Sequence, residues 1–282
     1  MIRKIDTALF ILSILFLILF LPNTVWAKDR VRVAVTIIPQ AYYVERIAGH
    51  NVDVRIIVPA GSNPETYEPT PQQLFDLSSS KLYIKVGPQH LAVENRFQRF
   101  TSNTDKNIRV VDMSQGIKNL QEDPHIWLSP SIVRSAAANI CEGLASADPS
   151  HADLYRKNLQ RFLTDIERLD QRIKQRLHDR KGQCFMVYHP AWGYFAREYG
   201  LKQLAIQEEG KPLNVARLQK MINLARAKGI KTIFVQKGFD KKSAASIARE
   251  IDGTVVEVNP LERDWLKNLD DFSQALQDTL RP

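Results

Sequence analysis

Four side chains with donor atoms that suit a divalent transition metal follow predicted strands or precede a predicted helix. Glu65 lies in the loop after the strand that ends at Val58, and His189 ends another strand. His125 precedes a helix, and Asn259 ends the last strand. Each has a structural explanation when taken alone. A His before Pro or before a helix is more often a hydrogen-bonded structural residue, Glu65 can be a solvated turn residue, and Asn-Pro is a common turn starter. Brought to one cleft, two imidazoles and a carboxylate are donors that Zn²⁺, Mn²⁺ and Fe²⁺ accept.

Short β-branched runs alternate with helical patterns along the chain, which predicts strands joined by crossover helices into parallel sheets. In such sheets ligands bind beyond the carboxyl ends of the strands, which is where these four side chains fall. We expect an α/β fold of two lobes, each a roughly four-stranded parallel sheet with flanking helices. The predicted strands cover residues 31–38, 52–58, 82–86 and 109–112 in the first lobe and 184–188, 203–206, 232–235 and 255–258 in the second.

One long, rigid helix is expected to link the two lobes. Its apolar residues recur at steps of three and four, which gives one continuous stripe. At 1.5 Å per residue, about 30 residues reach about 45 Å, longer than a small domain is wide. Packing across both lobes is the preferred interpretation, and a coiled-coil dimer seam is the alternative. The stripe consists of Leu159, Phe162, Ile166, Leu169, Ile173 and Leu177.

The first residues have the pattern of a cleaved export signal. Arg3 and Lys4 precede an apolar run that is shorter than the roughly 20 residues of a bilayer-spanning helix, and small residues precede the cleavage point at Ala27. We therefore expect a mature periplasmic protein that does not span the membrane. The expected division is a signal peptide at 1–27, an N-terminal lobe at 28–149, the linking helix at 150–181 and a C-terminal lobe at 182–282.

The charge distribution bears on the class of partner, and the two cysteines bear on disulfide formation. The formal net charge is +8, but Lys and Arg are scattered along the sequence, so we expect no nucleic-acid partner. Cys141 and Cys184 would meet an oxidising compartment, where a disulfide is possible. Because they fall in different halves of the chain, two buried free thiols are the preferred interpretation.

The motifs around these residues resemble the TroA-like family, the periplasmic metal-binding subunits of ABC importers for zinc, manganese and iron. The resemblance covers essentially the whole mature chain and implies the same two-lobed fold. It also implies a membrane permease of the ABC type as partner, and we expect a monomer. The motifs that carry it are Tyr67-Glu68-Pro69-Thr70-Pro71, Asp123-Pro124-His125-Ile126-Trp127-Leu128, His189-Pro190-Ala191-Trp192-Gly193-Tyr194-Phe195 and Asn259-Pro260-Leu261.

The resemblance implies that His125 and His189 are metal ligands, and it places Glu65 and Asn259 at the other two ligand positions. The family usually has His in place of Glu65 and Asp in place of Asn259. With neutral imidazoles this set carries a single negative charge, so it should bind a divalent ion less tightly than a set with two carboxylates unless another acid helps. Candidates for a further donor near strand ends are Glu209, Gln236 and Glu257.

We expect a carrier that captures a divalent transition metal and delivers it to its permease, not an enzyme. The imidazole nitrogens favour zinc, while the oxygen donors keep manganese and iron open. One alternative is a relative that binds a different small ligand or serves as an adhesin or structural protein. Another is a metallohydrolase with two His and one Glu as ligands, but the chain lacks a His-Glu-x-x-His motif and an evident general base.

Overall fold

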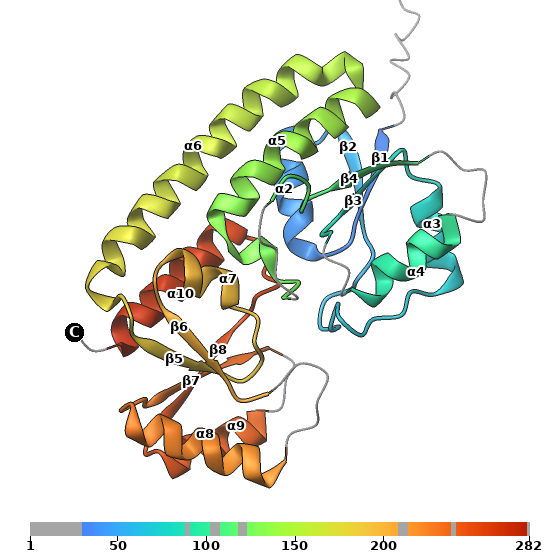
Figure 1. The fold of residues 1–282 in the computed structure, drawn as a ribbon. Helices are drawn as coiled ribbons and strands as arrows, with labels where there is room; N and C mark the ends of the chain where they lie inside the picture. The colour runs from blue at the N-terminus through green and yellow to red at the C-terminus, as the bar shows by residue number, and fades with distance from the viewer. Residues whose placement is uncertain are drawn as a thin grey trace, which may run out of the picture. The chain divides into compact units, whose positions relative to one another are not determined.

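Two four-stranded parallel sheets form the framework of the structure (Figure 1). This computed structural model describes residues 30–87, 91–101, 108–117, 123–207, 214–237 and 241–280. The strand orders are β2-β1-β3-β4 and β6-β5-β7-β8, as expected for two α/β lobes. The strands are β1 (Val31–Val35), β2 (Val52–Ile56), β3 (Leu82–Lys85), β4 (Arg109–Asp112), β5 (Cys184–Val187), β6 (Lys202–Ala205), β7 (Thr232–Gln236) and β8 (Thr254–Val258).

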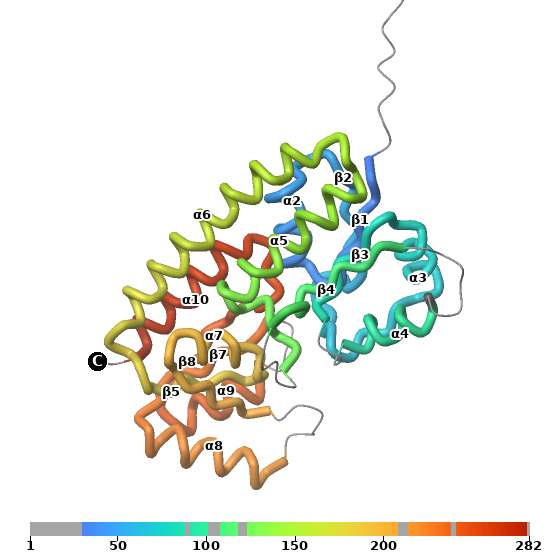
Figure 2. Tube along the Cα trace, turned by 45° about the horizontal axis from the view of Figure 1, so that its top comes forward, coloured from blue at the N-terminus to red at the C-terminus, as the bar shows by residue number. Residues whose placement is uncertain are grey.

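Helices connect the strands and cover both faces of each sheet. In the first lobe, α3 (Pro71–Ser78) and α4 (Ala92–Thr101) lie on one side of the sheet, and α2 (Ile38–Ala48) and α5 (Pro130–Ala147) lie on the other (Figures 1 and 2). The second lobe holds two separate apolar clusters, one on each sheet face. Its helices are α7 (Gly193–Glu198), α8 (Val215–Ala227), α9 (Lys241–Glu250) and α10 (Trp265–Thr279).

The first strand is shorter than the predicted 31–38, because α2 begins at Ile38. The β-branched pair Ile37 and Ile38 suggests a longer strand, but Pro39 falls in the first helical turn, where its missing N–H costs nothing. The side chain of Gln40 then accepts a hydrogen bond from the Ile37 N–H at 3.0 Å, which fixes the start of the helix. The other predicted strands agree with the observed ones to within two residues at each end.

The long linking helix is α6 (Ala152–Arg176), with short 3₁₀ turns before and after it. Its apolar stripe is buried inside this chain, so it is not available as a coiled-coil seam. The aromatic ring of Phe162 joins the two lobes: its centroid lies 6.0 Å from that of Tyr43 in α2 and 6.5 Å from that of Trp265 in α10. One continuous hydrophobic core therefore includes residues of both sheets and of α6.

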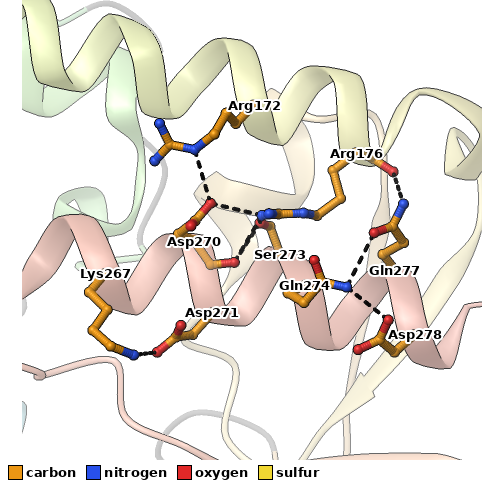
Figure 3. A network of polar contacts seen from close by, with 9 residues as sticks. All are labelled: Arg172, Arg176, Lys267, Asp270, Asp271, Ser273, Gln274, Gln277 and Asp278. Carbon is orange, nitrogen blue, oxygen red and sulfur yellow. Dashed lines mark hydrogen bonds and ion pairs between the residues drawn. The ribbon is translucent and has the colours of Figure 1, made fainter.

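Polar contacts attach the end of α6 to α10, the last helix of the second lobe (Figure 3). The guanidinium of Arg176 donates to the Asp270 carboxylate at 2.9 Å, to the Asp270 carbonyl at 3.0 Å and to Ser273. Burial acts to raise the pKa of Asp270, but the hydrogen bond and charge of Arg176 outweigh it and hold this pKa below its ordinary value. These contacts fix α10 along α6.

Both cysteines are free thiols. Cys141 is buried, and burial raises its pKa to about 11, whereas Cys184 is half-buried, contrary to the expectation that both are buried. Within the described residues, no helix is long and apolar enough to span a bilayer. The expected signal peptide at 1–27 lies outside the described residues.

Replacing Phe162 by Ala should lower the free energy of unfolding by about 3–5 kcal/mol, because the substitution leaves a cavity where both lobes meet α6. Urea denaturation followed by circular dichroism measures this change. The neighbouring Arg161 is exposed, and Arg161→Ala should change stability by less than about 0.5 kcal/mol. Equal stability of the two variants would contradict the role of Phe162.

Candidate metal centre

His125 is held by contacts that cross from the first lobe to the second. The residues after it form a 3₁₀ turn, Ile126–Leu128, which leads into α5. The Trp127 indole N–H donates to the Pro260 carbonyl at 2.8 Å, and the Trp265 indole N–H donates to the Trp127 carbonyl at 2.6 Å. Both indoles are fully buried, so these hydrogen bonds are shielded from water. These hydrogen bonds fix the backbone beside His125 against the second lobe.

The N-terminus of α5 is capped by a residue of the other lobe. Glu198 at the end of α7 accepts hydrogen bonds from the Ser129 hydroxyl and, at 3.0 Å, from the Ser131 N–H. A carboxylate is favourable there because the first N–H groups of a helix lack partners within the helix. Burial raises the pKa of Glu198 above its ordinary value despite these opposing hydrogen bonds. Glu198 therefore adds a second fixed contact between the lobes near His125.

Glu65 is positioned by an Asx turn in the loop after β2. The Asn63 side chain accepts a hydrogen bond from the Glu65 N–H at 3.0 Å, and the Asn63 carbonyl accepts one from Thr66 N–H at 3.3 Å. Asn before Pro is typical of such turns, since its side chain can bond to the backbone two residues later. The turn brings the Glu65 side chain to a site where it is 13% exposed.

His189 follows β5, an inner strand of the second sheet. Val187 of β5 pairs with Ala205 of β6 and with Phe234 of β7. Extending this parallel register by two residues places Gln207 on one side of His189 and Gln236 on the other. The carboxamide oxygens of both Gln residues are buried and have no hydrogen-bond partner. His189 thus lies at the carboxyl edge of its sheet.

The side chains of Glu65, His125 and His189 converge at one point. The Nε2 atoms of His125 and His189 are 3.3 Å apart, and Glu65 Oε1 lies 3.3 Å from the first and 3.2 Å from the second. An ion that binds His nitrogen and carboxylate oxygen at about 2.0–2.2 Å in tetrahedral geometry needs donors about 3.3 Å apart. The three donor atoms therefore have the spacing of one face of such a tetrahedron.

Asp123 orients His125 and was not predicted from the sequence. Its Oδ1 lies 2.8 Å from His125 Nδ1 and accepts the His125 N–H at 2.9 Å. A carboxylate at Nδ1 favours the tautomer in which the Nε2 lone pair is available to a metal. The signal was present in Asp123-Pro124-His125, because Asp-Pro starts turns and places the carboxylate beside the imidazole.

A glycine of the second lobe makes room for this carboxylate. A Cβ atom on Gly193 would lie 2.5 Å from Asp123 Oδ2, which is closer than two such atoms can approach. A side chain at the position after Trp192 would therefore have to displace the Asp123 carboxylate. The Asp123 carboxylate is then packed between the lobes, where its charge is partly shielded from solvent.

The other predicted donors Asn259, Glu257 and Glu209 differ in what the structure shows of their surroundings. Asn259 lies just past β8, where its Oδ1 accepts the Leu261 N–H at 3.1 Å and its Nδ2 donates to Glu262 at 3.0 Å. Glu257 is exposed and forms an ion pair with Lys241, which holds the pKa of Glu257 below its ordinary value. Among the described residues, no further His, Cys, Asp or Glu belongs to the cluster, and Glu209 lies outside them.

The chain is similar to a described protein family and to proteins of known structure over most of its length. A family profile described as ZnuA, zinc-uptake complex component A, periplasmic, matches residues 33–281. The high-affinity zinc uptake system protein ZnuA of Bacillus subtilis is 25% identical over 257 residues, which cover 83% of this chain and 79% of that protein. A crystal structure of a ZnuA has a TM-score of 0.84 at 36% identity and covers 90% of this chain and 100% of its own. A ZnuA deletion mutant with zinc bound has a TM-score of 0.82 at 36% identity and covers 90% of this chain and 99% of its own.

Replacing Asp123 by Ala should lower the affinity for zinc by about 10–100-fold, because His125 loses the acceptor that orients it. Isothermal titration with zinc measures the change, and circular dichroism of the metal-free variant checks that it folds. Asp179→Ala is a matched control, since it removes another Asp–His pair, at 2.8 Å from His178, that is largely exposed. Equal zinc affinities of the two variants would show that Asp123 does not support the metal site.

Proposed function

This chain belongs to the ZnuA family of periplasmic zinc-uptake components, and on that premise we propose that it binds one zinc ion between its lobes and releases it to an ABC permease. The observation that carries the proposal is the triangle of Glu65, His125 and His189 donor atoms, each 3.2–3.3 Å from the other two. Two imidazoles and one carboxylate suit zinc, and manganese or iron are the alternative cargoes.

Charge supports a divalent cargo at this site. Glu65 brings one negative charge into contact with the ion, and Asp123 places a second one behind His125 at 2.8 Å. These two charges match the +2 of the ion. In this proposal Asp123 is the further acid that a donor set with a single negative charge needs. The side chains of both His residues are 5% exposed, so little water competes with the ion for their lone pairs.

The same arrangement favours transport over catalysis. In this proposal no bond is made or broken, and the cycle consists of capture in the periplasm and release at the permease. An export signal at 1–27 would deliver the chain to that compartment, and the carrier would act as a monomer. We propose that the chain divides into lobes at 28–149 and 182–282, joined by a linking helix at 150–181. This linking helix keeps the two His residues within reach of one ion.

Zinc should stabilise the folded protein by about 2.7 kcal/mol when its free concentration is 100 times its dissociation constant. Thermal melting in the presence of Zn²⁺, Mn²⁺ and Fe²⁺ measures which ion raises the melting temperature most. His125→Ala and His189→Ala should each abolish the shift, and Glu65→Ala should reduce it. His50 is exposed and offers a matched control, so His50→Ala should keep the full shift. Normal zinc shifts in both single-His variants would exclude the proposed site.

Asn259 as a fourth donor stays a prediction. Its carbonyl oxygen already accepts one backbone hydrogen bond, which leaves a lone pair for a metal. If Asn259 contacts the ion, Asn259→Asp should strengthen zinc binding, because a carboxylate replaces a neutral carbonyl. Competition against a chelating dye measures the affinity. An unchanged affinity would mean that Asn259 is not a ligand.

A further inference from the structure

The short helix α7 links the two segments that carry the histidine donors. It begins at Gly193, shortly after His189, and ends at Glu198. His125 lies in the segment 123–131, which leads through a 3₁₀ turn into α5. α7 lies beside the start of α5 (Figure 1), and both of its ends contact the 123–131 segment. The helix that follows one imidazole donor is thus packed against the chain on both sides of the other.

At its first residue, α7 approaches the carboxylate that orients His125. A Cβ atom on Gly193 would lie 2.5 Å from Asp123 Oδ2, so the backbone of α7 lies directly against this carboxylate. The other oxygen, Asp123 Oδ1, lies 2.8 Å from His125 Nδ1. The start of α7 is therefore packed against the group that sets the orientation of this imidazole.

At its last residue, α7 is attached to the N-terminus of α5. Glu198 accepts hydrogen bonds from the Ser129 hydroxyl and, at 3.0 Å, from the Ser131 N–H. The Ser129 hydroxyl is also the N-cap of α5, since it accepts the Ile132 N–H at 3.3 Å. Hydrogen bonds to an ionised acceptor are roughly twice as strong as those between neutral groups. Glu198 therefore ties the end of α7 to the helix that begins shortly after His125.

Glu198 differs from the other polar contacts that hold the lobes together near the site. The hydrogen bonds of the two buried indoles attach the 123–131 segment to Pro260 and to α10. Those contacts reach the second lobe at a distance along the chain from His189. Glu198 instead joins the 123–131 segment to the helix that directly follows His189. Its contacts therefore act on the placement of one imidazole donor relative to the other.

We propose that Glu198 is a positioning residue for the metal site, which holds α7 against the 123–131 segment and so keeps His125 and His189 within reach of one ion. The inference rests on the proposed function. The two Nε2 atoms come from different lobes, so their separation of 3.3 Å depends on contacts between the lobes. Without Glu198, a smaller fraction of the metal-free protein would hold both imidazoles in place. The apparent dissociation constant for zinc rises as that fraction falls.

Zinc affinity of the full chain, measured by competition against a chelating dye, tests the proposal. Glu198→Ala should lower the affinity by about tenfold, the lower end of the loss expected when a group that supports a metal ligand is removed. Glu198→Gln should restore most of the affinity, because the carboxamide can accept the Ser131 N–H and donate to the Ser129 hydroxyl. Unchanged affinity of Glu198→Ala would overturn the proposal. A Gln variant as weak as the Ala variant would also overturn it, since Glu198 would then act through its charge.

Asp148 at the other end of α5 offers a matched control. This carboxylate is also largely buried, and it accepts hydrogen bonds from the Tyr155 hydroxyl at 2.6 Å and the Ser150 hydroxyl at 2.7 Å. α5 has 18 residues, so at 1.5 Å per residue Asp148 lies about 27 Å from the Glu198 contacts. Asp148→Ala should destabilise the metal-free protein, because it leaves the buried Tyr155 hydroxyl unpaired, but it should keep the zinc affinity.

Urea denaturation of the metal-free variants shows the conditions under which each is folded, and the zinc affinities are compared there. Equal losses of zinc affinity in Asp148→Ala and Glu198→Ala would mean that Glu198 matters only for stability. Ser129→Ala keeps the test available if Glu198→Ala does not fold, and it should lower the zinc affinity by less than Glu198→Ala does. Unchanged zinc affinity of Ser129→Ala would count against the proposal.

A double-mutant cycle tests whether Ser129 and Glu198 act through one contact. The loss of zinc binding free energy in the double variant should be smaller than the sum of the two single losses, because the second substitution removes a contact that is already broken. Additive losses would contradict the proposal. If zinc does not bind the unaltered protein, the carrier proposal fails, and the inference on Glu198 fails with it. If zinc binds but Glu198→Ala has no effect, only the inference on Glu198 is wrong.

Discussion

The metal site depends on one geometric constraint, which is that donors from two separate sheets must meet within 3.3 Å. Glu65 and His125 come from the first lobe and His189 from the second, so an error of about 1 Å in the placement of either lobe would destroy the site. The buried hydrogen bonds of Trp127 and Trp265 and the packing of Phe162 on α6 hold that placement. The packing between the lobes thus sets the spacing of the three donor atoms.

Electrostatics explains why the cluster is built from neutral and negative groups that are mostly buried. Two imidazoles and a carboxylate in close contact leave lone pairs pointing at one another, which a cation between them converts into attraction. Asp123 adds negative charge behind His125 without entering the cluster, and Gly193 leaves the space that this carboxylate needs. If Asn259 binds the ion, the charge of Asp123 offsets the carboxylate that Asn259 lacks.

Much of this arrangement could be predicted from the sequence, and the missing parts have physical reasons. The strands and the stripe of α6 follow from local periodicity, and the meeting of Glu65, His125 and His189 follows from the rule that ligands gather at the carboxyl ends of parallel strands. The end of β1 was missed because Pro39 and Gln40 start a helix inside a β-branched run.

The roles of Glu198 and Gly193 could not be read from the sequence because each depends on a partner far along the chain, whereas the Asp123–His125 contact is local. Glu198 accepts a hydrogen bond from Ser129, and Gly193 leaves room for the Asp123 carboxylate. Such pairings arise only when the two lobes are assembled, and local patterns do not encode them.

Diffraction from zinc-loaded crystals at the zinc absorption edge locates the bound ion. We expect one strong anomalous peak within about 2.0–2.2 Å of a Glu65 carboxylate oxygen and of the Nε2 atoms of His125 and His189. A peak that contacts only one lobe, or a peak remote from both imidazoles, would contradict this expectation.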